Sequence, residues 1–404
     1  MNTLIEKIFK NLGYYFYTPK IDTFGGYIYY LIWLKKIKKK ISKKKIIITQ
    51  IFDPHSKHYY KSSFNPPFRY KLSLYNDLNF SEKLLSLIFS IYVFLNSIIY
   101  YFVFFRRFKK FFCLSLGYTN RLKDNLSYFS ISTPEDLYKE DCDYNFLNLE
   151  KINKENNHIV FCVKDLNYLK YKKITEISCA NIKKYKSAID RLVFNNKVIR
   201  VGDPSNEVFK YSNLENFVDH TKDKKYFELM ISSFFKSKFF FGTGGSQSYL
   251  GILSKSERYI SNSIDFCGLE TSFSKKNFCI FKSIFYKKKN KILSLTEIFE
   301  DGHFFKIFEN PENYIFIEND ENEIDNLAKI LVTNDKQQHI DEDLIKKFNQ
   351  IRKQSFIKFK LSEKDEYFKL VTNCEINIPK FFIQNTLNYG KYLEEKTRKF
   401  LSND

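Results

Sequence analysis

Residues 236–262 read KSKFFFGTGGSQSYLGILSKSERYISN and join four local patterns. An apolar run at residues 239–241 leads into a turn rich in glycine and hydroxyl side chains, and an amphipathic segment follows at residues 247–254. A second strand-like segment, residues 258–261, ends at Asn262. These patterns predict a buried strand, a glycine-rich turn, a helix N-terminus and a second strand.

The turn predicts an anion site, because backbone N–H groups at a helix start can approach an anion closely and the helix dipole favours negative charge. Two common phosphate loops are excluded by spelling. Ser246 and Gln247 stand where a Walker loop has Lys and Ser or Thr, and Gln247 replaces the third glycine of the dinucleotide pattern. A diphosphate fits, and the alternative is a tight turn without a ligand. The candidate binding residues are Gly242, Thr243, Gly244, Gly245 and Ser246.

Two upstream segments predict further strands that end in polar residues. Residues 158–163 end at Lys164 and Asp165, and residues 197–201 end at a turn containing Asp203. An amphipathic crossover helix is expected between them, at residues 181–192. The alternation of strand and helix predicts a right-handed parallel α/β layer, and such sheets bind ligands at the carboxyl ends of their strands. Four further candidate residues therefore lie at predicted strand ends: Lys164, Asp165, Asp203 and Asn262.

The series of motifs resembles a group of bacterial glycosyltransferases of surface-polysaccharide synthesis, which is similar in turn to other GT-B nucleotide-sugar transferases. The resemblance covers roughly residues 155 to 390. It departs from the family pattern where Lys164 replaces an arginine, where Ala180 precedes Asn181 in place of arginine, and where His220 replaces a tyrosine. The motifs that carry it are Val163-Lys164-Asp165, Asn181-Ile182, Val198-Ile199-Arg200-Val201-Gly202-Asp203, Val218-Asp219-His220, Lys238-Phe239-Phe240-Phe241-Gly242-Thr243-Gly244 and Ser294-Leu295-Thr296-Glu297-Ile298.

The resemblance implies an α/β, GT-B-like architecture of two Rossmann-like lobes with a cleft between them, the first lobe being less regular. It implies transfer of a sugar from a nucleotide diphosphate donor to a saccharide or lipid-linked acceptor, without a metal and with inversion. The nucleotide-sugar is then a co-substrate, and no cofactor is expected. The alternative is a catalytically inactive GT-B-like binding or scaffold protein of a polysaccharide assembly system, because several motif positions are substituted.

A chain of 404 residues predicts two domains. We assign residues 1–150 to an acceptor-side lobe and residues 151–404 to a donor-binding lobe, whose last segment, residues 380–404, could return to the first lobe. In the first lobe, residues 14–17, 27–34 and 45–52 read as one βαβ unit.

Asp53 and His55 follow the second strand of that unit, and either is a candidate for the base that deprotonates the acceptor. Asp165 is the third candidate catalytic residue. The alternative for Asp53 and His55 is turn chemistry and a surface histidine.

Charge and hydropathy predict contact with a membrane surface. The chain carries 66 basic and 46 acidic side chains, a formal net charge of +20. Residues 35–45 are rich in lysine, and the uncharged residues 84–105 precede the basic pair Arg106 and Arg107. Polar residues recur along 84–105, so peripheral or buried placement is favoured over a membrane span. The chain is expected on the inner face of the cytoplasmic membrane.

Metals and nucleic acids are not predicted as partners. The seven cysteines are scattered without a Cys-x-x-Cys pair, which fits a reducing cytoplasm and predicts no zinc site. No recognised nucleic-acid motif accompanies the lysines, so a nucleic-acid binder is the disfavoured interpretation of the charge.

Overall fold

The computed structural model describes residues 14–17, 45–48, 158–165, 177, 179–202, 207, 209, 215–223, 226–266, 268, 270–271, 274, 276–359 and 374–403. The chain divides into two compact units, of which the second consists of Ser132–Glu140 and Ile152–Asp404. In the first unit, β1 (Tyr14–Tyr17) and β2 (Lys45–Ile48) pair in parallel. Parallel pairing fits the predicted βαβ unit, whose helix at 27–34 lies outside the described residues.

Six parallel strands form the main sheet of the second unit. They are β3 (His158–Cys162), β4 (Val198–Arg200), β5 (Phe217–Asp219), β6 (Ser237–Thr243), β7 (Glu257–Ser263) and β8 (Phe278–Phe281). Their order across the sheet is β5-β4-β3-β6-β7-β8. Numbered along this unit, the order is 3-2-1-4-5-6, which is the order of Rossmann-type doubly wound sheets. The predicted α/β class with a parallel sheet is confirmed.

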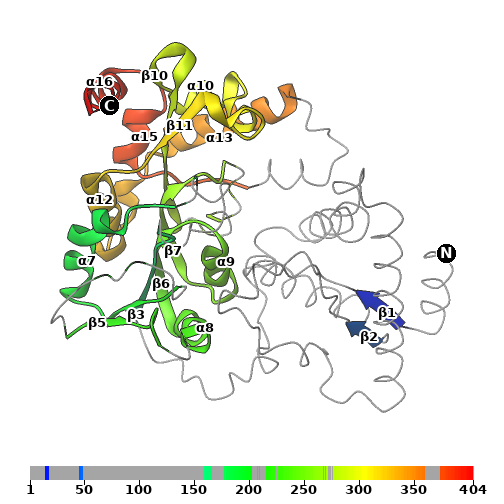
Figure 1. Cartoon of the computed structure of the whole chain (residues 1–404), viewed down its shortest axis with the longest axis vertical. Helices are drawn as coiled ribbons and strands as arrows, with labels where there is room; N and C mark the ends of the chain where they lie inside the picture. The colour runs from blue at the N-terminus through cyan, green and yellow to red at the C-terminus, as the bar shows by residue number, and fades with distance from the viewer. Residues whose placement is uncertain are drawn as a thin grey trace. The chain divides into compact units, whose positions relative to one another are not determined.

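Helices cover both faces of this sheet (Figure 1). One face carries α7 (Lys186–Val193) and α12 (Glu321–Val332), and the other carries α8 (Tyr226–Lys236) and α9 (Ser246–Leu253). Right-handed crossovers require this division, because the chain moves from β3 toward one edge of the sheet and from β6 toward the other.

The apolar run of β6 supplies both halves of the core. Successive side chains of a strand point to opposite faces of its sheet. Phe240 therefore stacks on Phe234 of α8, with ring centroids 5.5 Å apart, whereas Phe241 meets Tyr185 at 6.2 Å on the side of α7. All four side chains are buried, so burial on both faces explains why the strand reads as continuous phenylalanine rather than as an alternating pattern.

A smaller antiparallel sheet follows β8 and has the order β10-β9-β11. Its strands are β9 (Ser283–Tyr286), β10 (Lys291–Ile292) and β11 (Tyr314–Ile317). The helices of this part are α10 (Leu295–Glu300), α11 (His303–Glu309), α13 (Glu342–Lys358), α15 (Lys380–Thr386) and α16 (Lys391–Asn403). Helix α16 packs Leu393 against Phe285 and Ile292, which places this C-terminal segment on the second unit.

Most predicted elements of the second unit are confirmed within one or two residues. The crossover helix differs at its start, because residues 182–185 form a 3-10 turn, η6 (Ile182–Tyr185), before α7 begins. Asn181 caps this turn by accepting a hydrogen bond from the Lys183 N–H at 3.0 Å. The predicted boundary at residue 150 and the segment 84–105 lie outside the described residues.

Candidate functional site

The candidate site lies at the carboxyl ends of β3 and β6, which are neighbours in the sheet. The chain leaves these two strands toward opposite edges, and such a switch point is where open α/β sheets bind ligands. The backbone N–H of Lys164 donates to Thr243 Oγ1 at 2.9 Å, so the segment that follows β3 contacts the glycine loop directly. The sequence predicted both features at strand ends, and the strand order brings them together.

Glycine is required at position 242 by the closeness of β3. A Cβ on Gly242 would lie 1.8 Å from the Cys162 carbonyl oxygen, and the backbone φ is +152°. No side chain fits in that space. The loop then turns at Gly245, which has a φ of +123° and directly precedes α9. The glycine-rich turn and the helix start are therefore confirmed as structure.

Glu270 occupies the N-terminus of α9. Its carboxylate accepts a hydrogen bond from the Gly245 N–H at 2.6 Å. A Cβ on Gly244 would lie 2.1 Å from Glu270 Oε2, so the second glycine makes room for this side chain. Glu270 is only 7% exposed. An acidic side chain of the protein thus stands where the sequence predicted a phosphate oxygen, as expected of an anion-binding helix start.

Burial and nearby charges shift the pKa values of Glu270 and Lys164. The pKa of Glu270 is raised well above its ordinary value, first by burial and then by the charge of Asp265, while the Gly245 N–H, Arg258 and Lys164 act in the opposite direction. The pKa of Lys164 is lowered, mainly because burial disfavours its charged form. An added anion would favour the charged ammonium of Lys164.

Asp165 belongs to a buried ion cluster that links three strand ends. Its Oδ2 lies 3.7 Å from Arg200 Nη2 and accepts the Glu207 N–H at 2.6 Å. Arg200 also donates to Asp219 Oδ2 at 2.8 Å. With Asp165 1% exposed and Arg200 fully buried, these contacts support a structural function. The predicted catalytic role of Asp165 stays a prediction.

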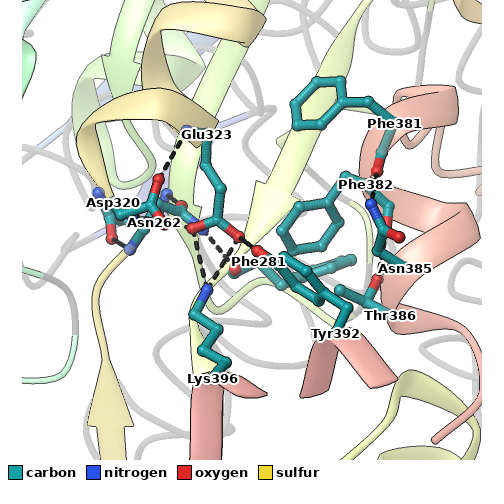
Figure 2. A network of polar contacts seen from close by, with 11 residues as sticks. Asn262, Phe281, Asp320, Glu323, Phe381, Phe382, Asn385, Thr386, Tyr392 and Lys396 are labelled. Atoms are coloured by element: carbon teal, nitrogen blue, oxygen red, sulfur yellow. Dashed lines mark hydrogen bonds and ion pairs between the residues drawn. The ribbon is translucent and has the colours of Figure 1, made fainter. Parts of the chain in front are cut away.

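Asn262 is the last but one residue of β7, adopts the left-handed region with φ at 54°, and is buried. Its N–H donates to Asn319 Oδ1 at 2.6 Å, and its own Oδ1 accepts the Asn319 N–H at 2.8 Å. Its Nδ2 donates to the Tyr185 hydroxyl at 3.0 Å. Figure 2 shows Asn262 in a polar network that continues to Glu323 on α12 and Lys396 on α16. Both ends of its amide are engaged within the protein, and its predicted contact with a donor stays a prediction.

Other predicted site residues are not placed. Asp53, His55 and Asp203 lie outside the described residues, and Ser246 is described only as the first residue of α9. Within the described ranges, no group of three His, Cys, Asp or Glu side chains gathers as metal ligands would. In those same ranges no helix is both long and apolar enough to cross a bilayer.

Two residues near the site were missed by the sequence reasoning. Glu270 lies 25 positions beyond Gly245, in a segment without a regular pattern, and only the fold brings it to the loop. Lys282 follows β8 and donates to the Cys179 carbonyl oxygen, 103 positions away. A signal for Lys282 was available, because it is a polar residue at the carboxyl end of an apolar run, FCIF.

Comparisons with known proteins found no similarity that extends this description. No family model matches the chain, and neither a curated protein nor a solved structure matches it significantly.

Proposed function

We propose that the chain is a glycosyltransferase whose second unit binds a nucleotide diphosphate sugar at the carboxyl ends of β3 and β6. The single observation that carries this proposal is the hydrogen bond from the backbone N–H of Lys164 to Thr243 Oγ1 of the glycine loop. It lies at the point where the strand order reverses. The motif resemblance over residues 155–390 supports it. A GT-B arrangement in which residues 1–150 form the other Rossmann-like lobe, on the acceptor side, is part of the proposal.

The chemistry needs groups that stabilise a leaving diphosphate as the glycosidic bond breaks. Positive groups fixed in place before the reaction stabilise developing charge without reorganising. The ammonium of Lys164 and the N-terminus of α9 are such groups, and they follow two paired strands of the sheet, β3 and β6. The acceptor, a saccharide or a lipid-linked saccharide of the bacterial cell surface, would then displace the diphosphate directly.

Glu270 must release the Gly245 N–H if a phosphate is to reach that donor. A protonated Glu270 would repel the phosphate less, and its raised pKa makes the protonated form easier to reach. The hydrogen bond between Glu270 and the Gly245 N–H also favours the alternative, a binding or scaffold protein without catalysis. A carboxylate that stayed bound to the loop would block the donor. Activity separates these two functions.

A screen of nucleotide-sugars by thermal shift tests the proposal. A ligand at one hundred times its dissociation constant stabilises the fold by roughly 2.7 kcal/mol. We expect one nucleotide-sugar to stabilise the full chain, and Lys164→Ala to weaken its binding by about 1.5–3 kcal/mol, the range for charge-assisted hydrogen bonds. Lys197→Ala is the matched control, because Lys197 is exposed and precedes the opposite, amino end of β4.

Three outcomes are decisive. Binding with slow donor hydrolysis, or with transfer to an acceptor, supports the transferase. Binding without any turnover supports the scaffold function instead. Failure of every nucleotide-sugar to stabilise the protein, or equal binding by the Lys164→Ala and Lys197→Ala variants, removes the donor site from this part of the sheet.

A further inference from the structure

Lys282 is a buried lysine at the carboxyl edge of the sheet. It stands alone between β8, which ends at Phe281, and β9, which begins at Ser283. Its backbone N–H donates to the Ser263 carbonyl oxygen at 3.0 Å, which fixes the main chain beside the end of β7. The residue is 3% exposed. Lysines are rarely buried to this degree unless a partner compensates the charge.

Within the described part of the chain, the ammonium of Lys282 has fewer acceptors than it can use. It carries three N–H donors, and among the described residues it forms one hydrogen bond, to the Cys179 carbonyl oxygen, and no ion pair. Glu318 is the acidic group that raises the Lys282 pKa most, but its carboxylate binds the Lys184 ammonium at 3.2 Å and the Asn181 N–H at 3.0 Å. An anionic ligand would supply the missing acceptors.

The same short segment ties Lys282 to the candidate site. Cys179 accepts from Lys282, and the next residue, Ala180, donates its N–H to the Lys164 carbonyl oxygen at 2.9 Å. Lys164 in turn contacts Thr243 of the glycine loop. The charges of both lysines also act on the Cys179 thiol. The peptide that joins Cys179 to Ala180 therefore connects Lys282 with Lys164, the residue that contacts the glycine loop.

We propose that Lys282 and Lys164 together bind the diphosphate group of the ligand, with Lys282 as the second cation. This inference rests on the proposed function, and it assigns to the site a residue that directly follows β8, the strand at the edge of the sheet. A purely structural lysine would be expected to bind a carboxylate or several carbonyls, whereas the buried ammonium of Lys282 donates to one carbonyl oxygen among the residues that the structure describes. Two ammonium groups suit a ligand with two linked phosphates.

Binding measurements on the full chain test the proposal with two kinds of probe, pyrophosphate and a set of nucleoside diphosphates. Lys282→Met keeps the length and apolar stem of the side chain but removes its charge. We expect this variant to bind both probes at least about tenfold more weakly, a loss of roughly 1.4 kcal/mol. Lys197→Met, an exposed lysine before β4, should bind like the wild type.

A second variant serves if Lys282→Met does not fold. Lys282→Arg keeps a charge that does not titrate. The Lys282 pKa, by contrast, is lowered mainly by burial, against the opposing effects of Glu318 and Cys179, while Lys184 and Lys164 add smaller decreases. Raising the pH from 7 to about 10 deprotonates such a lysine but not an arginine. Pyrophosphate affinity should therefore fall more steeply with pH in the wild type than in Lys282→Arg. Equal slopes overturn the proposal.

The outcomes separate this inference from the proposed function. Pyrophosphate binding that depends on Lys282, without binding of any nucleoside diphosphate, supports the two-lysine anion site and rejects the nucleotide donor. Nucleotide binding that is the same in Lys282→Met and in the wild type overturns the role of Lys282 and leaves the donor site intact. A wild-type protein that binds neither probe overturns both.

Discussion

Glu270 is the residue at which the acid–base chemistry of the site is most unusual. Its carboxylate is buried and accepts the Gly245 N–H at the N-terminus of α9. Besides burial, the charge of Asp265 raises its pKa, and the charge of Lys164 lowers it. Helix N-termini favour anions, yet burial disfavours the ionised form more strongly, and the net result is a raised pKa. A buried acid that holds its proton more tightly in the folded state makes stability depend on pH.

We predict that Glu270→Gln stabilises the protein at alkaline pH. The folded-state pKa of Glu270 exceeds its unfolded value, so the folded state binds more protons and the wild type loses stability as the pH rises from about 4.5 through the folded-state pKa. Glutamine can still accept the Gly245 hydrogen bond and does not ionise. We expect the variant to be more stable by roughly 1–3 kcal/mol at pH 8 and to lose this advantage near pH 4.5.

Urea unfolding at both pH values measures the effect. Glu300→Gln, at an exposed position, is the control and should not differ from the wild type. The same Glu270→Gln variant should bind pyrophosphate roughly tenfold more tightly, since a negative charge beside Lys164 is removed. A pH-independent difference in stability would contradict the account of Glu270.

At the scale of elements, Glu323 joins two helices that are far apart in sequence. It closes a capping box with Asp320 at the start of α12, where its Oε2 accepts the Asp320 N–H at 2.9 Å. Its Oε1 accepts from the Tyr392 hydroxyl at 2.6 Å and from Lys396 Nζ at 2.8 Å, both on α16 (Figure 2). The carboxylate of Glu323 thus caps the start of α12 and also binds two side chains of α16.

We predict that the Glu323–Lys396 pair is strongly non-additive. Both side chains are largely shielded from water, at 7% and 13% exposure. Glu323→Gln or Lys396→Met alone leaves a poorly solvated charge and should cost about 3 kcal/mol, whereas the double variant should lie closer to the wild type than either single variant. The free energy of unfolding, measured in urea, tests this cycle.

A surface pair on the same helix provides the comparison. Lys391 Nζ lies 3.9 Å from Glu395 Oε1, and both side chains are well exposed. The interaction energy from the corresponding double-mutant cycle should therefore be less than about 1 kcal/mol. Additive effects at Glu323 and Lys396 would mean that α16 is not held by this ion pair.

For the whole molecule, the excess of positive charge bears on where the protein resides. The net charge of +20 includes the lysine run at residues 35–45 and the basic residues that follow the uncharged segment 84–105. Each basic residue close to an anionic bilayer contributes on the order of 1 kcal/mol, and salt screens this attraction. A transferase with a lipid-linked acceptor would work at such a surface.

We predict that the protein sediments with membranes and is released by high salt or by carbonate. Fractionation of cells that produce the full chain checks this. Neutralising the lysines of residues 35–45 should lower the membrane-bound fraction, and neutralising the lysines at 287–289, which are exposed in η7 (Lys287–Lys289), serves as the control. Resistance to both washes would indicate a spanning segment, and a protein that never sediments would contradict the membrane hypothesis.

Local pattern was sufficient to predict the strands and helices around residues 158–201 and 236–262 of the second unit. The apolar runs of β3 and β6 and the glycine turn before α9 follow from side-chain and backbone preferences within a few neighbouring residues. Start signals are equally local, as in the boxes Ser294 to Glu297 and Asp320 to Glu323, where a cap residue is followed by glutamate three positions later. The predicted α/β class followed from the alternation of such elements.

Tertiary structure alone decided which strand ends meet and what stands beside the glycine loop. The sequence could place Lys164 and Thr243 at strand ends, but only the pairing of β3 with β6 made them neighbours. Glu270 lies 25 positions from its partner Gly245, and Lys282 lies 103 positions from its partner Cys179. Neither contact produces a periodic pattern in the sequence. The physical reason is that strand order and long-range polar contacts result from packing the whole chain at once, whereas periodicity reports only the burial of each segment.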